Sequence, residues 1–305
     1  MARQQAIASD RQDLLQRYLR GENITEFLRG SSATNSEAII EVAYDLQAGS
    51  YRKDMSNPTV LNKKEAYCRE LANRILSLTT PSTVLEAGVG EATTLSFTLA
   101  NLPETQGFGF DISWSRIAVA NEWLAENRIG DRCDLCTASL FSIPLPDNSV
   151  DVVYTSHSIE PNGGQEEAAV EELYRVASNY LILLEPAYDL ADHKAQERMR
   201  QHGYCIDLQP AIQKLGYPVE YHGLFPHCMS PLNPTGITII KKPAAFQNQP
   251  AFCCPTTKQE LIEIEGALLS PSNLVAYPIL AGIPCLREEN GIIASRLTHP
   301  KQTEK

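Results

Sequence analysis

The sequence predicts an α/β fold built around a doubly wound, seven-stranded and mostly parallel sheet. Two observations support this prediction. From Pro81 onward, short apolar runs of strand length alternate with helical stretches, which is the pattern of βαβ units. The first run, at residues 83–87, leads into the turn formed by residues 86–90, Glu-Ala-Gly-Val-Gly. A glycine turn after the first strand of such a fold is a common nucleotide site.

The other strands and helices follow from the same apolar periodicity. We expect strands at residues 83–87, 107–112, 132–137, 150–156 and 180–185, with helices near 92–101, 115–127 and 165–177 between them. Helical stretches around 191–202 and 207–215 lead to two more strands, 218–225 and 236–242, which we expect to form a hairpin at the sheet edge.

The segments on either side of this region differ from it in character. Residues 1–80 are predicted to form a helical N-terminal cap, with helices at 13–28, 36–47 and 60–78 and a break at 48–52. Residues 81–242 form the predicted sheet domain, and residues 252–298 form a small β-rich module behind a linker. About 50 residues are too few for an independent core, so we expect the module to dock on the sheet domain and act in cis.

Charge and cysteine content exclude several classes of protein. Lys and Arg number 26 against 37 Asp and Glu, a net charge of −11, which argues against a broad nucleic-acid surface. The eight cysteines are scattered, and the single C-x-x-C spacing, Cys133 and Cys136, has no second pair to match it, so we expect neither a disulfide framework nor a metal site. With no leader and no apolar run long enough to span a bilayer, the sequence predicts a soluble, cytoplasmic protein without membrane contact.

Two carboxylates narrow the choice of nucleotide. Glu86, at the end of the first strand, would repel a pyrophosphate, whereas S-adenosylmethionine has no phosphate and carries an ammonium and a sulfonium. Thr93 replaces the third glycine of the dinucleotide fingerprint. Asp111 lies 21 positions after Gly90 (111 − 90), the spacing of an acid that binds ribose hydroxyls; the alternative is a helix N-cap. These charges favour S-adenosylmethionine over NAD.

Four motifs in order carry a family resemblance. Val-Leu-Glu-Ala-Gly-Val-Gly at 84–90, Gly-Phe-Asp-Ile-Ser at 109–113, Ile-Pro-Leu-Pro-Asp-Asn-Ser-Val-Asp-Val-Val at 143–153 and Glu-Leu-Tyr-Arg-Val at 172–176 resemble the class I S-adenosylmethionine-dependent methyltransferases. The resemblance covers roughly residues 80–242. It implies a Rossmann-like fold, S-adenosylmethionine as cofactor and methyl transfer as the reaction.

The resemblance also implies roles for individual residues. Glu86, Gly88 and Gly90 would face the methionine part of the cofactor, and Asp111 with its neighbour Ile112 would bind the ribose side. Ser139 and Leu140 fall where the family contacts adenine. An aspartate is common at the position of Ser139, whose hydroxyl can still accept from the exocyclic amine.

The loop after the fourth strand, residues 156–164, is expected beside the transferred methyl group, because ligands meet the carboxyl ends of parallel strands. Ser156 starts it. His157 and Glu160 are the candidate general bases; the alternative is that they hydrogen-bond within the loop and shape it. Tyr51, with Tyr44, is a candidate lid over the cofactor.

Two further expectations concern the rest of the chain. Tyr188, after the fifth strand, is a candidate residue of the acceptor pocket. Cys-Pro-Thr-Thr-Lys-Gln-Glu-Leu at 254–261 and Tyr-Pro-Ile-Leu-Ala-Gly-Ile-Pro at 277–284 resemble the small zinc-ribbon-like activator subunit of certain tRNA and release-factor methyltransferases. Thr257 and the run 270–273 stand where zinc-binding members have cysteines, which implies a module that has lost its metal.

The sequence thus predicts an enzyme that methylates an oxygen or nitrogen of a small molecule. Two alternatives stay open: a methyltransferase acting on tRNA or protein, as the activator-like module suggests, and a protein that binds S-adenosylmethionine without turnover. The acidic balance and the absence of an Asn-Pro-Pro-Tyr motif after the fourth strand weigh against the first alternative. The sequence leaves a homodimer open.

Overall fold

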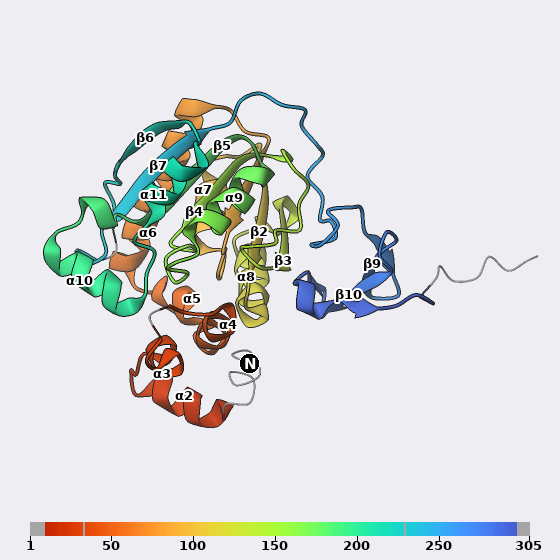
Figure 1. Ribbon diagram of the computed structural model, residues 1–305, viewed down its shortest axis with the longest axis horizontal. Coiled ribbons are helices and arrows are strands. Elements are labelled where there is room, and N and C mark those ends of the chain that lie inside the picture. Colours follow the sequence, from red (N-terminus) through yellow and green to blue (C-terminus); the bar gives the residue numbers. More distant parts are fainter. Residues whose placement is uncertain (1–9, 33, 229, 298–305) are drawn as a thin grey trace, which may run out of the picture.

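The computed structural model describes residues 10–297 apart from 33 and 229. Seven strands form its central sheet: β1 (Thr83–Ala87), β2 (Gln106–Asp111), β3 (Cys133–Thr137), β4 (Val150–Ser156), β5 (Ala177–Pro186), β6 (Val219–Leu224) and β7 (Thr235–Lys241). Their order is β3-β2-β1-β4-β5-β7-β6, with β7 antiparallel to both of its neighbours (Figure 1). The predicted seven-stranded, mostly parallel sheet is confirmed.

Helices cover both faces of the sheet, and an apolar cluster fills each interface. One face packs against α6 (Pro58–Leu78), α7 (Thr93–Ala100) and α8 (Trp114–Glu126), and the other against α9 (Glu166–Val176) and α11 (Leu208–Leu215). The helix α10 (His193–His202) lies between β5 and α11 in the chain. Of these, α6 is the longest; the Asn57 side chain accepts from the Thr59 amide 2.9 Å away at its start, and Pro58 fills its first turn.

The N-terminal cap is built from short helices on the side where the parallel strands end (Figure 1). They are α2 (Arg11–Leu19), α3 (Ile24–Arg29), α4 (Glu37–Leu46) and α5 (Ser50–Asp54). Leu14, Ile24 and Val42 join the first three through a small apolar cluster. The predicted break at residues 48–52 is wrong in part, because the one-turn helix α5 begins there. Its N-terminus is held by a side chain far away in sequence, described below.

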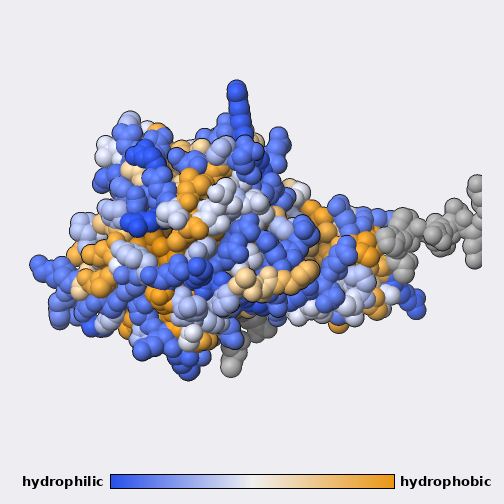
Figure 2. Space-filling view, turned by 90° about the horizontal axis from the view of Figure 1, so that it is seen from above, coloured by the Kyte–Doolittle hydropathy of each residue, from blue (hydrophilic) through white to orange (hydrophobic). Residues whose placement is uncertain are grey.

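The C-terminal module is a small antiparallel sheet of β8 (Ile262–Ile264), β9 (Ala267–Ser270), β10 (Val275–Leu280), β11 (Ile283–Pro284) and β12 (Ile292–Ile293). It projects as a lobe from the body of the protein (Figure 2). The Leu286 amide donates to the Thr137 carbonyl, 2.8 Å away, so the chain after β11 continues along the outer edge of β3. Tyr277 and Leu286 belong to the same apolar cluster as β4 and β5.

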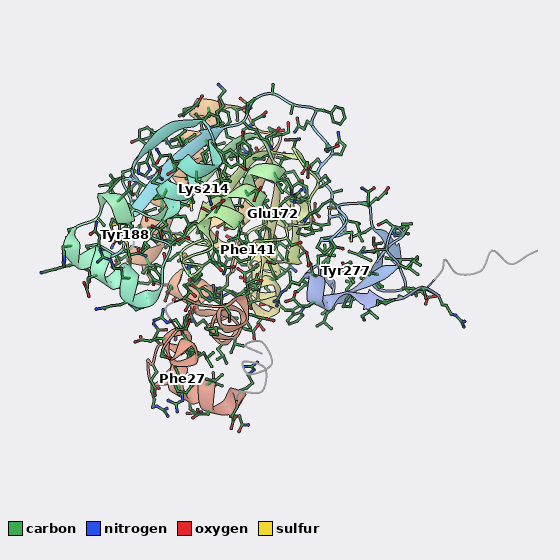
Figure 3. The ribbon with its side chains drawn as sticks, viewed as in Figure 1. Phe27, Phe141, Glu172, Tyr188, Lys214 and Tyr277 are labelled. Carbon is green, nitrogen blue, oxygen red and sulfur yellow. The ribbon has the colours of Figure 1, made fainter. Side chains whose placement is uncertain are left out.

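A salt bridge adds to this contact. Glu172 on α9 accepts from the Ile143 amide at 2.7 Å and from Lys258 Nζ of the module at 3.1 Å. Figure 3 shows Glu172 and Tyr277 on the two sides of this contact. The module therefore shares both core and polar contacts with the sheet domain. Within the described residues, no helix is long and apolar enough to cross a membrane.

Candidate active site

A cavity of about 440 Å³ opens where β1, β2, β3 and β4 end, and helices α4, α5 and α6 of the cap form its other side. Residues from the glycine turn, from the tip of β2, and from the loop after β4 all line it. The strand order brings these segments together, because β1 lies between β2 and β4. This is the crevice in which open α/β sheets bind ligands.

The glycine turn needs its glycines for two separate reasons. At Gly88 the backbone is left-handed, with φ +67°, and a Cβ there would lie 2.3 Å from the Cβ of Ser158 in the loop after β4. Gly90 is also left-handed, with φ +56°, and its amide donates to Asp111 Oδ2 at 2.9 Å. Gly88 thus lets the two loops meet, and Gly90 ties the turn to the tip of β2.

Asp111 is buried, and both of its carboxylate oxygens are oriented by backbone amides. The second amide is that of Ser113, 2.9 Å from Oδ1. Ser113 itself caps α8, since its hydroxyl accepts from the Arg116 amide. The alternative sequence interpretation, Asp111 as the N-cap, is therefore wrong, and Asp111 faces the cavity. Burial raises its pKa, and the nearby Arg116 guanidinium opposes that shift.

Glu86 lies at the bottom of the cavity with almost no exposed surface. Burial raises its pKa to about 8, although the Lys64 ammonium and the Tyr154 hydroxyl favour the charged form. Tyr154 donates to Glu86 Oε2 at 3.1 Å, and Lys64 Nζ donates to Thr94 Oγ1 at 2.6 Å. A ligand with an ammonium group would add a charged hydrogen-bond donor to the one that Tyr154 already provides, and would further favour the charged form of Glu86.

Sequence reasoning missed Lys64, yet a signal for it exists. Lys64 lies in the apolar stripe of its helix, in register with Val60, Tyr67, Leu71 and Ile75. A lysine in such a stripe is unusual unless its ammonium has a partner at the buried end. The same holds for Arg116, which stands in the buried face of α8 beside Ile117.

Arg116 is almost fully buried between two tyrosines of the cap. Its Nε donates to the Tyr44 carbonyl at 2.9 Å, and its guanidinium carbon lies 4.8 Å from the Tyr44 ring centroid and 4.5 Å from that of Tyr51. Its Nη2 is buried and has no hydrogen-bond partner within the described part of the chain. Arg116 lines the cavity, and its positive charge acts on the Asp111 carboxylate nearby.

Tyr51 reaches the cavity because the glycine turn holds its helix. Glu91 Oε1 accepts from the amides of Gly49 at 3.0 Å and Tyr51 at 3.3 Å, and Oε2 accepts from that of Arg52 at 2.7 Å. The Arg52 side chain then pairs with Glu122 and Glu126 on α8. These contacts close the start of α5 over the cavity.

The loop after β4 begins with a coupled pair. His157 has a left-handed backbone, with φ +61°, and its Nδ1 hydrogen-bonds Glu160 Oε2. Its Nε2 lies 2.8 Å from Thr235 Oγ1, and Asn233 Nδ2 donates to Glu160 at 3.0 Å. Burial alone would lower the pKa of His157, but the Glu160 carboxylate outweighs it and raises that pKa. The pKa of Glu160 is lowered, because His157 overcomes the effect of burial.

Comparison with known proteins identifies the domain that carries this cavity. A family model described as a methyltransferase domain matches residues 84–179, the span from β1 to the first residues of β5. The protein is an S-adenosylmethionine-dependent methyltransferase. Its cofactor is S-adenosylmethionine. A search of curated protein sequences finds no significant match.

Solved structures agree on the fold of this methyltransferase. A putative O-methyltransferase from Nostoc punctiforme is 13% identical, with a TM-score of 0.54, over 75% of this chain and 69% of that one. Magnesium protoporphyrin IX methyltransferase from Synechocystis, solved with bound S-adenosylhomocysteine, is 13% identical, with a TM-score of 0.52, over 68% of this chain and 99% of that one. At these identities the likeness shows the fold alone.

Most of the predicted site residues of the methyltransferase line the cavity, but two of them do not. Ser139 and Tyr188 do not line the cavity; Tyr188 borders a small separate hollow beside β5. The predicted residues that line the cavity are Glu86, Gly88, Gly90, Asp111, Ile112, Leu140, Ser156, His157, Glu160, Tyr44 and Tyr51. Among the described residues, no group of three or more His, Cys, Asp or Glu side chains is placed to hold a metal ion.

Proposed function

We propose that this methyltransferase transfers the methyl group to an oxygen or nitrogen of a small-molecule metabolite. The observation that supports this most is the continuity of the cavity, which runs from the glycine turn to the His157–Glu160 pair beneath the cap helices. Its volume of about 440 Å³ falls in the range of small-molecule sites, about 300–1,000 Å³. A covered cavity of this kind suits a metabolite better than a segment of tRNA or protein.

The cofactor is proposed to lie across the tips of β1 and β2. Glu86 receives the ammonium of the methionine part, and Lys64 lies on the same wall as a partner for its carboxylate. Asp111 accepts from the ribose hydroxyls, and the Arg116 guanidinium beside it favours the charged form of the Asp111 carboxylate. The list of proposed cofactor contacts is completed by Gly88, Gly90, Ile112, Leu140, Ser156 and the lid residue Tyr51.

The His157–Glu160 pair, directly after Ser156, is proposed to face the methyl acceptor. The Ser156 hydroxyl lies 3.0 Å from the Tyr67 hydroxyl of α6, which closes that side of the cavity. In-line transfer from a sulfonium needs mainly proximity and alignment, with a base for an acceptor that carries a proton. His157 Nδ1 carries a proton and donates it in a hydrogen bond to the Glu160 carboxylate, so Nε2 is the nitrogen that can accept a proton. The Thr235 hydroxyl beside Nε2 also lines the cavity and can pass a proton to it.

The C-terminal module is proposed to be a metal-free relative of the activator subunit that stabilises the sheet domain. The Cys254 sulfur lies 3.2 Å from Thr256 Oγ1, 3.7 Å from the Tyr277 hydroxyl and 3.8 Å from Asn273 Nδ2. Polar side chains thus occupy the space around the one cysteine retained from that motif.

All eight cysteines are free, which supports a reducing, cytoplasmic setting.

Methyl transfer with labelled S-adenosylmethionine tests the proposal. The purified protein is incubated in parallel with a desalted metabolite extract, with total tRNA and with a protein extract. We expect label in the metabolite fraction and its loss in a His157→Asn, Glu160→Gln double variant that still binds the cofactor by calorimetry. Label confined to tRNA or protein would refute the small-molecule acceptor, and tight cofactor binding without transfer to any pool would favour a non-catalytic protein.

A further inference from the structure

The cavity beyond Asp111 carries a carboxylate that comes from the cap and not from the sheet. Glu37 is the first residue of α4, and it lines the cavity together with Ile40 and Tyr44 on the same face of that helix. Burial raises its pKa, while the Ser139 hydroxyl and the Arg287 guanidinium favour the charged form. Its position in the first helical turn also favours a negative charge.

Ser139 holds this carboxylate in a fixed direction. The Ser139 hydroxyl donates to Glu37 Oε1 at 2.5 Å and accepts from the Phe141 amide at 3.1 Å. Its one proton is therefore committed to Glu37, and Ser139 itself does not line the cavity. No hydrogen bond to Glu37 Oε2 is found among the described residues, so this oxygen is available to a ligand.

The walls next to Glu37 are apolar. Phe110 and Ile112, at the tip of β2, and Ala138 and Leu140, just after β3, line this part of the cavity. An apolar wall with one acceptor at its edge suits an aromatic base that presents a hydrogen-bond donor at its rim.

We propose that Glu37 recognises the exocyclic amine of the cofactor's adenine, and that Ser139 is a positioning residue for Glu37. The amine donates to Oε2 of Glu37, giving a charge-assisted hydrogen bond in a buried place. This assignment moves adenine recognition from Ser139, where the sequence placed it, to a carboxylate supplied by the cap. It rests on the proposed orientation of the cofactor, with its ribose at Asp111.

The chemistry gives a sharp criterion for the role of Glu37. S-inosylhomocysteine has a carbonyl oxygen where S-adenosylhomocysteine has the amine. An ionised carboxylate accepts hydrogen bonds only, so it repels that oxygen and leaves both groups without a donor. Wild-type protein should therefore bind S-adenosylhomocysteine at least about 100-fold more tightly than S-inosylhomocysteine.

Calorimetry with both ligands on the full-length protein tests the proposal. In Glu37→Ala we expect the ratio of the two dissociation constants to fall at least about tenfold, because the discriminating group is gone. In Glu37→Gln the amide can donate to the inosine carbonyl, so the ratio should fall further. Ser139→Ala should lower the ratio less than Glu37→Ala does, since Glu37 remains but is no longer held.

The matched control is Ile39→Ala, on the same helix α4. Ile39 is half-buried, carries no charge and does not line the cavity, so this variant tests any general effect of disturbing the helix. It should keep the wild-type ratio. An unchanged ratio in Glu37→Ala overturns the role of Glu37. If Asp111→Ala binds S-adenosylhomocysteine as tightly as wild type, the orientation of the cofactor is wrong instead, and the two failures are distinguishable.

Discussion

Glu91, directly after the glycine turn, caps the helix that carries Tyr51. Its carboxylate accepts from three backbone amides of residues 49–52 at distances of 2.7–3.3 Å. The glycine turn and the helix that covers the cavity beside it are therefore joined by one side chain. A change at Glu91 should be felt in the lid even though the sheet is untouched.

We expect Glu91→Ala to release the start of α5 and weaken cofactor binding at least about tenfold. Three part-buried amides lose their acceptor, which costs on the order of 1–2 kcal/mol. Calorimetry with S-adenosylhomocysteine measures the affinity, and thermal unfolding measures the stability. The control is Glu122→Gln, which weakens an exposed pair with Arg52 on the same segment. Equal affinity in Glu91→Ala and wild type would show that the lid does not depend on this cap.

Glu86→Gln should separate stability from cofactor binding. In the folded protein the pKa of Glu86 is raised from 4.5 to about 8, so between these values the folded state holds a proton that the unfolded chain releases. Stability contributed by this group is complete below about pH 4.5 and is lost as the pH rises toward 8. Removing the buried charge should therefore stabilise the ligand-free protein at pH 8 by on the order of 1 kcal/mol.

The same variant should bind S-adenosylmethionine at least about tenfold more weakly, because the ammonium loses its charged partner. Thermal unfolding at pH 8 and pH 5.5, with and without cofactor, measures both effects. The gain in melting temperature should be larger at pH 8. A Gln variant that is less stable at pH 8 and binds normally would contradict the assigned role of Glu86.

The sheet could be predicted from sequence because its signals are local. Apolar runs of strand length, the glycine turn and helices of 3.6-residue period place nearly every strand of the central sheet within a few residues. The prediction that Asp111 belongs to the site follows from its spacing of 21 positions from Gly90. These features need no knowledge of which distant segments meet.

The contribution of the cap to the site could not be predicted, because it depends on contacts between distant segments. Helix α5 forms where a break is expected, since its cap is Glu91, about 40 residues away. The sequence predicts Ser139 as a cofactor contact, because nothing local reveals that its hydroxyl donates to Glu37 on α4. Lys64 and Arg116 could be noticed in the sequence as charged residues on the apolar faces of their helices. The groups that they contact, however, depend on how the cap packs against the sheet domain.

Glu160→Gln should lower the pKa of His157. The Glu160 carboxylate raises that pKa against the effect of burial, so replacing its charge moves the imidazole titration to lower pH. NMR titration of the His157 ring in wild type and variant measures the shift directly. If His157 is the base, the acidic limb of kcat/KM should move in the same direction with the acceptor identified by the transfer screen.

A charge-matched control for this titration is Glu167→Gln, on the surface of α9. It removes the same charge from a residue paired with Lys214, away from the cavity. It should leave the His157 titration unchanged. A His157 titration that is the same in Glu160→Gln and wild type would show that the pair is not coupled in solution.

Leu286 tests whether the C-terminal module and the sheet domain unfold as one unit. Its side chain is fully buried in the apolar cluster shared with the sheet, and its amide donates to Thr137. We expect Leu286→Ala to lower the free energy of unfolding by about 2–5 kcal/mol, the cost of a cavity in a packed core. Ile293→Ala, at a position 85% exposed in the same module, should change it by less than about 0.5 kcal/mol.

Chemical denaturation followed by both circular dichroism and tryptophan fluorescence measures this difference. Trp114 and Trp123 both lie on α8, but Trp114 Nε1 donates to the Leu280 carbonyl of the module at 3.3 Å. The experiment is therefore done in a Trp114→Phe background, where the fluorescence of Trp123 reports the sheet domain and not the module. If the module stabilises the sheet domain, the fluorescence transition of Leu286→Ala moves to lower denaturant together with the circular dichroism. A fluorescence transition at the wild-type midpoint would mean that the module unfolds by itself, and that the contact along β3 contributes nothing to the domain that binds the cofactor.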